Sequence, residues 1–171
     1  PVGDYLVEAP SPGEVGPNFA SPPLVLNEVL AEPETAGPGQ TFFEIANPGA
    51  TPVSLAHVRW RYGTTAGAAL SGAFAADRVI KAGGFLVLHF DATAPDDSAN
   101  VYLGGGVALD PAGGSLALYK NALNDDDALN LVDFVEWGAG GQPLEAVGVT
   151  GAQWGPGEFV PRPAAGQSIN F

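Results

Sequence analysis

Glycine and proline interrupt this chain so often that they exclude most helical architectures. The 171 residues include 24 glycines and 16 prolines, spread along the whole sequence. Both residue types disfavour helix interiors, so this content argues against a helical bundle or a coiled coil, and the strict triplet period of collagen is missing. Because 46% of the residues are apolar, the chain still carries enough apolar surface for a sizeable core.

Short apolar runs, separated by Gly, Pro, Asn and Asp, recur along the sequence in a rhythm that is typical of an all-β protein. The clearest alternation is His57–Tyr62, where Val58, Trp60 and Tyr62 share one face of a strand. The candidate strands are Leu24–Leu30, Phe42–Asn47, Val53–Leu55, His57–Tyr62, Arg78–Ile80, Phe85–Phe90, Val101–Leu103, Ser115–Lys120 and Leu129–Trp137.

Three further expectations follow from local pattern. Phe85–Leu88 shows no alternation, so it predicts a central strand that is covered on both faces. The alanine-rich stretch Thr65–Ala76 contains two glycines and predicts a loop or a short strand, and no helix is expected anywhere. Asn124–Asp127 predicts the tip of a hairpin between two strands.

The charge balance excludes two classes of partner. The chain has 19 acidic and 6 basic side chains and a net charge of −13. Neutralising a phosphate backbone needs clustered Lys and Arg, so nucleic-acid binding is not expected, and neither is docking on an anionic membrane. The apolar runs are far shorter than the ~20 residues of a membrane helix, so we expect no membrane insertion. The carboxylates fall mostly in turns, which indicates an acidic, soluble exterior.

The two ends of the chain share a short pattern. Gly3–Leu6, followed by Gly13 and Asn18-Phe19, echoes Gly157–Val160, followed by Gly166 and Asn170-Phe171. Either such strings recur by chance in a glycine-rich chain, or residues 1–22 are an N-terminal extension that is the tail of a preceding copy in a tandem array. Residues 23–171 are then the domain itself. The chain has no Met and begins with Pro, so we expect a processed product or a piece of a longer protein.

Five motifs occur in order along the chain. They are Leu24–Leu30, with Asn27 and Glu28 at its centre; the strand and turn that contain Glu44 and Asn47; Pro52–Leu55; Val79–Val87; and the hairpin pair Leu116–Tyr119 with Val132–Trp137. In order and spacing they resemble the motifs of the lamin tail domain family. The first is similar to that family's opening strand, and the second to its second strand and turn.

The resemblance implies an immunoglobulin-like β-sandwich of about eight or nine strands. The bacterial members of the family resemble accessory modules of secreted or surface proteins, so an extracellular or cell-surface location is expected. The implied work is non-catalytic: adhesion, spacing or binding of an unidentified protein, cell-surface or glycan partner. Fold resemblance alone does not transfer a function.

The residues that match the family signature invite two interpretations. Glu28 and Glu44 form a candidate carboxylate pair for acid–base chemistry or metal binding, or else they are structural, hydrogen-bonded groups of the signature, which we favour. Asn27, Asn47, Trp60 and Trp137 are expected to be structural, with both tryptophans as core anchors. The two histidines, His57 and His89, lack a serine nucleophile in a suitable context, so no enzyme activity is expected.

The sequence also permits a second function, calcium-dependent binding of carbohydrate. Asn124, Asp125, Asp126 and Asp127 offer oxygen ligands to Ca²⁺, as do Asp91, Asp96 and Asp97 as a weaker set, although solvated turns explain both. Trp154 lies in a polar loop context and is the best candidate for an exposed aromatic contact. Together these features favour, as the alternative, a calcium-dependent carbohydrate-binding module attached to an extracellular hydrolase.

Overall fold

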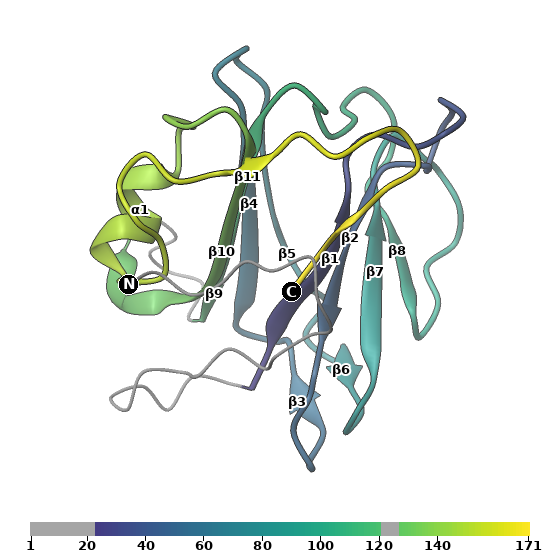
Figure 1. Ribbon diagram of the computed structural model, residues 1–171. Coiled ribbons are helices and arrows are strands. Elements are labelled where there is room, and N and C mark those ends of the chain that lie inside the picture. The colour runs from purple at the N-terminus through teal and green to yellow at the C-terminus, as the bar shows by residue number, and fades with distance from the viewer. Residues whose placement is uncertain (1–22, 121–126) are drawn as a thin grey trace.

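The computed structural model describes residues 23–120 and 127–171 of the chain as an all-β sandwich, which confirms the predicted fold class. The first sheet has the order β12-β1-β2-β7-β8 and the second has the order β11-β10-β9-β4-β5. A two-stranded ribbon, β3 with β6, lies at one end of the sandwich (Figure 1).

The bounds of the elements are as follows. The first sheet contains Val25–Leu30 (β1), Phe42–Ala46 (β2), Phe85–His89 (β7), Asn100–Tyr102 (β8) and Ile169–Asn170 (β12). The second contains Val58–Gly63 (β4), Ala69–Ala73 (β5), Gly114–Lys120 (β9), Leu131–Gly138 (β10) and Val160–Pro161 (β11). The ribbon is Val53–Ser54 (β3) with Val79–Ile80 (β6), and the helical elements are Glu145–Thr150 (α1) and the 3₁₀ turn Ala128–Asn130 (η1).

All nine predicted strands are present, with ends that differ by one or two residues. The described residues form twelve strands, of which β3, β6, β11 and β12 have only two residues each. Sequence reasoning left Thr65–Ala76 open between loop and strand; its centre is β5. It missed β11 and β12, because a two-residue strand exists only through its partner and carries no periodicity of its own.

Aromatic rings from both sheets form the centre of the core. Phe43 of the first sheet lies 5.7 Å from Trp60 of the second, measured between ring centroids, and 5.9 Å from Phe90. Tyr62 lies 5.7 Å from Phe90 and stacks on Trp137 at 6.0 Å. These edge-to-face and stacked contacts are the arrangements that aromatic quadrupoles favour, and they join the two sheets across the core.

The second sheet is also covered on its outer face. The ring of Phe134 in β10 contacts Trp154 at 5.2 Å and faces Gly148 of α1. A Cβ atom at Gly148 would lie 2.7 Å from that ring, so the close approach of helix and sheet requires glycine. The expectation of no helix is wrong here: six residues around a glycine have little helix propensity, and packing on β10 supplies the stability instead.

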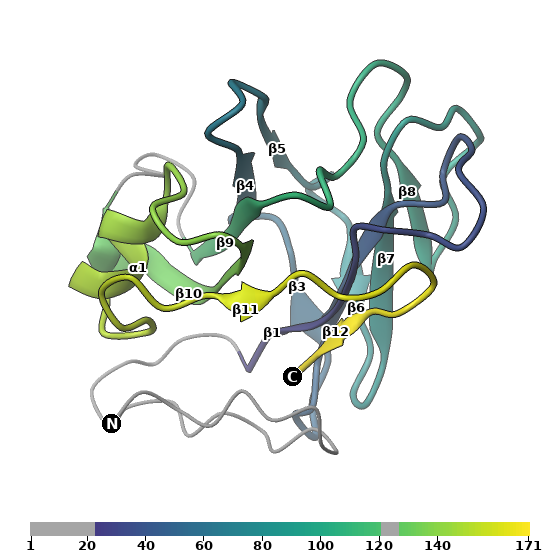
Figure 2. The same ribbon diagram turned by 45° about the horizontal axis from the view of Figure 1, so that its top comes forward.

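The expectation that Phe85–Leu88 is covered on both faces is also wrong. Leu86 and Leu88 are buried in the core, but Phe85 is 53% exposed and Val87 is only partly buried. Within residues 23–120 and 127–171, no helix covers the outer face of the first sheet, since α1 packs on the second sheet (Figure 2). A run of apolar residues does not reveal which layer covers it.

The C-terminal segment contributes an edge strand to each sheet. Val160–Pro161 pairs in parallel with β10, and Ile169–Asn170 pairs antiparallel with β1, so this segment crosses from one sheet to the other (Figure 1). Between the two strands, Arg162 donates two hydrogen bonds to the Glu32 carboxylate, at 2.7 and 2.6 Å. The segment therefore holds one side of the sandwich closed.

A carboxylate also links the two sheets directly. The register of β1 shifts between Leu26 and Glu28, and that of β10 shifts between Leu131 and Asp133. At this paired irregularity, Asp133 Oδ2 accepts the backbone N–H of Leu26 at 2.7 Å, and its Oδ1 accepts that of Phe134 at 2.8 Å. Burial outweighs these bonds and raises the pKa of Asp133 to about 6.

We expect Asp133→Ala to lower the free energy of unfolding by about 2 kcal/mol, because two backbone N–H groups lose their acceptor. Asp133→Asn keeps one amide oxygen as acceptor, so it should cost less. Urea unfolding measures both changes, with Asp77→Ala, in an exposed turn, as the control. An Asp133→Ala protein as stable as the control would show that this link contributes nothing.

Candidate binding surface at the β5 and β8 edges

The two sheets end in β5 and β8 on the same side of the sandwich, and a pocket of about 100 Å³ lies between these strands. Its walls come from both sheets and from the loop that follows β5. The lining includes Trp60, Gly72, Phe74, Arg78, Leu88 and Val101. Most are apolar, and Arg78 and Asp96 bring opposite charges to the same pocket.

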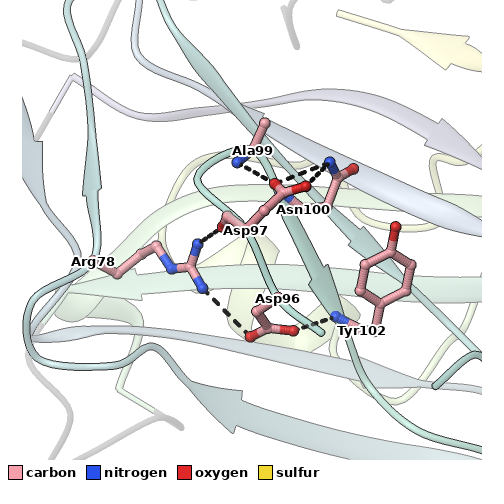
Figure 3. Close-up of polar contacts among 6 residues, drawn as sticks. All are labelled: Arg78, Asp96, Asp97, Ala99, Asn100 and Tyr102. Atoms are coloured by element: carbon pink, nitrogen blue, oxygen red, sulfur yellow. Dashed lines mark hydrogen bonds and ion pairs between the residues drawn. The ribbon is translucent and has the colours of Figure 1, made fainter. Parts of the chain in front are cut away.

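The free edge of β8 is capped by the loop that precedes it (Figure 3). Asp97 Oδ1 accepts the backbone N–H groups of Ala99 and Asn100, both at 2.8 Å, and the Asp97 N–H donates to the Asn100 carbonyl at 3.0 Å. Asp96 Oδ1 accepts the N–H of Tyr102 at 3.0 Å. The outward backbone groups of β8 at Asn100, and the outward N–H at Tyr102, are thus already paired.

Arg78 holds this capping loop in place. Its guanidinium donates to the carbonyl of Asp97 and lies 3.4 Å from Asp96 Oδ2 (Figure 3). The backbone N–H of Ala99 and the side chain of Asn100 lower the pKa of Asp97, with a smaller contribution from the charge of Arg78. Asp96 and Asp97 therefore direct their oxygens at N–H donors of the protein. This arrangement is the one expected of aspartates that stabilise a turn, the alternative to calcium binding for this set.

The free edge of β5 has no such cap. Thr64 N–H donates to Ala68 O at 2.9 Å, so antiparallel alternation places Leu70 and Gly72 in bonded pairs with β4. Ala69, Ser71 and Ala73 then direct their N–H and C=O groups away from β4, and all three side chains are exposed. Among residues 23–120 and 127–171, no hydrogen bond to these outward groups occurs.

Gly72 brings β5 unusually close to the ring of Trp60. A Cβ atom at Gly72 would lie 2.7 Å from Cε2, Cζ2 and Nε1 of that ring. Trp60 is only 4% exposed, and its indole N–H has no hydrogen-bond partner within the described part of the chain. Because Gly72 and Trp60 both line the pocket, an unpaired donor lies at the pocket wall.

Two signature residues form a hydrogen bond on the first sheet. Asn27 Nδ2 donates to Glu44 Oε1 at 2.7 Å, and Glu28 lies directly opposite Glu44 across the β1–β2 pair. Burial raises the pKa of Glu44, and the charge of Glu28 adds to that effect. The described residues contain no group of three or more potential metal ligands, so Glu28 and Glu44 come together as a pair and not as part of a larger cluster.

The other signature residues lie in the framework. Asn47 is fully buried; its amide donates to the carbonyls of Thr51, Ile80 and Lys81, and its Oδ1 accepts from Gly49 N–H at 3.0 Å. Trp60 and Trp137 are buried in the core, as expected of anchors. Sequence reasoning did not foresee that one of these anchors also borders a pocket, because Gly72 opposite Trp60 carries no readable signal.

The expectation that Trp154 is an exposed aromatic contact is wrong. Trp154 is 4% exposed, packs on Phe134, and donates its indole N–H to Glu158 O at 2.6 Å. The polar and glycine-rich residues around it indicated a loop, which is correct, but this loop folds back over β10 and buries the ring. Trp154 therefore does not offer a stacking platform for a sugar.

The candidate calcium ligands Asn124, Asp125 and Asp126 lie outside the described residues. Asp127 lies within them, and its Oδ1 accepts the N–H of Leu129 at 2.9 Å as the cap of η1. The repeat proposed for residues 1–22 also lies outside them, so tandem copies stay a prediction.

The comparisons with known proteins leave the family open. A scan against protein-family models finds no match, and a search of curated proteins finds none either. In the described part of the chain, the helices are too short to span a membrane.

A buried carboxyl group lies on the covered face of the second sheet. Glu136 is fully buried; its Oε1 accepts the N–H of Gln142 at 3.1 Å, and its Oε2 has no partner within the described residues. Burial, helped by the charge of Glu145, raises the pKa of Glu136 to about 7.

The raised pKa of Glu136 makes stability depend on pH. The unfolded carboxyl titrates near 4.5, so between that pH and about 7 the folded state binds more protons than the unfolded state. We therefore expect the free energy of unfolding to fall as the pH rises through this window. Glu136→Gln should flatten the fall, whereas Glu34→Gln, at an exposed position, should leave it unchanged. Urea unfolding at several pH values checks this, and a Glu136→Gln profile that matches wild type would contradict the assignment.

The cap on β8 makes a local prediction. Asp96→Ala removes the acceptor of the Tyr102 N–H and the ion-pair partner of Arg78, so we expect amide exchange at Tyr102 to accelerate about tenfold. Hydrogen–deuterium exchange followed by NMR measures it. Asp91→Ala is the control, because Asp91 accepts from Gly106 and not from β8. Equal protection of Tyr102 in both variants would rule out the cap.

Proposed function

We propose that this chain is a non-catalytic binding module of the lamin-tail type, from a secreted or surface protein of a bacterium, and that it binds a protein partner through an open sheet edge. The observation that carries the proposal is the contrast between β5 and β8. One edge is closed by Arg78, Asp96 and Asp97. Within the described residues, the other presents unpaired backbone groups at exposed positions. An open edge is a template for pairing with another strand.

The residues that carry the family resemblance support the first part of the proposal. Asn27 with Glu44, and Asn47 with its four side-chain hydrogen bonds, hold the first sheet and the β3–β6 end in shape. Trp60 and Trp137 anchor the core. These signature positions are thus committed to the framework, which leaves recognition to edges and loops.

The candidate catalytic groups His89 and Glu44 also make hydrogen bonds within the framework of the fold. His89 lies 3.0 Å from Gly39 O through Nδ1 and 3.0 Å from Asn100 Oδ1 through Nε2, and its ring stacks on Tyr102. Glu44 accepts from Asn27. Groups held in this way position strands and loops, which favours a binding role over a catalytic one.

Binding to two arrays tests the proposal. The purified chain, labelled with a fluorophore, is applied to a peptide array and to a glycan array, each with Ca²⁺ and with a chelator. We expect it to bind peptides independently of Ca²⁺ and to leave the glycan array dark. Calcium-dependent glycan binding would contradict the proposal and favour the carbohydrate-binding alternative, and failure to bind any peptide would also contradict it.

A further inference from the structure

We propose that β5 and the adjoining pocket bind an extended peptide of a partner protein as a sixth strand of the second sheet. A small side chain of that peptide enters the pocket, and the peptide carries Lys or Arg. This inference rests on the proposed binding function and names the surface and the chemistry of the ligand. It comes from three independent features: the backbone edge, the pocket and the net charge of the chain.

The backbone edge determines the shape of the ligand. Ala69, Ser71 and Ala73 alternate along β5 with their N–H and C=O groups directed outward. The strand contains neither proline nor a charged residue, and natural edges commonly use these features to prevent pairing. The neighbouring edge β8 is closed by its own loop. An added strand is therefore directed to β5.

The pocket determines which side chain the ligand carries. Its volume of about 100 Å³ is smaller than the ~150 Å³ cavity that admits benzene, so an aliphatic side chain fits better than an aromatic ring. Leu88, Val101 and Phe74 supply apolar walls. The indole N–H of Trp60 makes no hydrogen bond within the described residues and is not among their buried unpaired atoms, so it stays accessible to a ligand with an acceptor. Threonine meets both demands, with its methyl group and its hydroxyl oxygen.

Charge determines which other side chains the ligand carries. Arg78 and Asp96 balance each other in the pocket wall, and Arg59 and Arg61 lie opposite Ala73 and Ser71 on β4, so the acidic bias comes from the chain as a whole. The whole chain carries −13. A second copy of the chain would meet this field as a like charge, whereas a basic peptide is attracted by it. The charge thus favours a basic partner over self-association.

The test begins with a library of random linear peptides displayed on phage and selected on the intact chain. We expect the selected peptides to alternate apolar and polar residues, to place Thr at one position, and to carry Lys or Arg. Replacing that Thr by Gly in a synthetic copy should weaken binding about tenfold by fluorescence anisotropy. Replacing its Lys or Arg by Glu should weaken binding as well, and more so at low salt.

A matched pair of variants locates the binding site. The N–H of Ser71 points away from β4, so Ser71→Pro removes a donor that the fold does not use. Ser71→Thr keeps the donor. We expect Ser71→Pro to weaken peptide binding about tenfold or more and Ser71→Thr to leave it unchanged. Should Ser71→Pro not fold, peptides N-methylated at alternate amides make the same test from the ligand side, because they cannot pair with the edge.

Three outcomes would overturn the inference. Peptides that bind equally to wild type and Ser71→Pro would place the site elsewhere and contradict binding through the open edge, whereas the wider proposal of a peptide-binding module would stand. Dimers in analytical ultracentrifugation that Ser71→Pro abolishes would make a second copy the occupant of β5. A selection that enriches no peptide would overturn both the inference and the proposed function.

Discussion

The aromatic contacts between the sheets are the constraint on which the rest of this structure depends. Phe43 in β2 and Phe90 directly after β7 come from the first sheet, and Trp60 and Tyr62 come from β4 of the second. Their rings meet at centroid distances of 5.7 to 5.9 Å. Large rings bury much apolar area at little cost in side-chain entropy, so they fix the spacing of the sheets. Trp60 takes part in this cluster and also borders the pocket. The core anchor and the candidate binding surface therefore share one side chain.

The two neighbouring edge strands β5 and β8 differ in whether their outward backbone groups are hydrogen-bonded. At β8 two aspartates pair backbone N–H groups and Arg78 holds their loop, whereas the outward groups of β5 have no hydrogen-bond partner within the described residues. An unpaired edge risks aggregation, which the strong negative charge of the chain counteracts by repulsion between copies. The charge thus offsets the tendency to self-association that an unpaired edge brings.

Sequence periodicity predicted the strands better than it predicted their surroundings. Apolar and polar residues alternate in His57–Tyr62 because one face of β4 lies on the core. Any strand with one buried face shows the same alternation. The sequence predicts a covered Phe85 and an exposed Trp154, and the structure shows the opposite for both. Whether a residue is covered depends on segments that lie far away in the chain. The pocket was not foreseen either: it depends on how Gly72 meets Trp60, a contact that no local pattern encodes.

The C-terminal segment has a consequence for how the molecule folds. The partner of Glu28 in β12 is Asn170, and residues 160–161 complete the other sheet along β10. The β1–β12 pairing closes a loop that spans nearly the whole domain, and contacts of that kind form late because their entropy cost precedes their gain. Until the segment docks, β1 and β10 present unpaired edges of their own. A partly folded molecule therefore exposes more unpaired strand edges to other chains than the native one does. The rate at which these few residues dock sets the lifetime of this aggregation-prone intermediate.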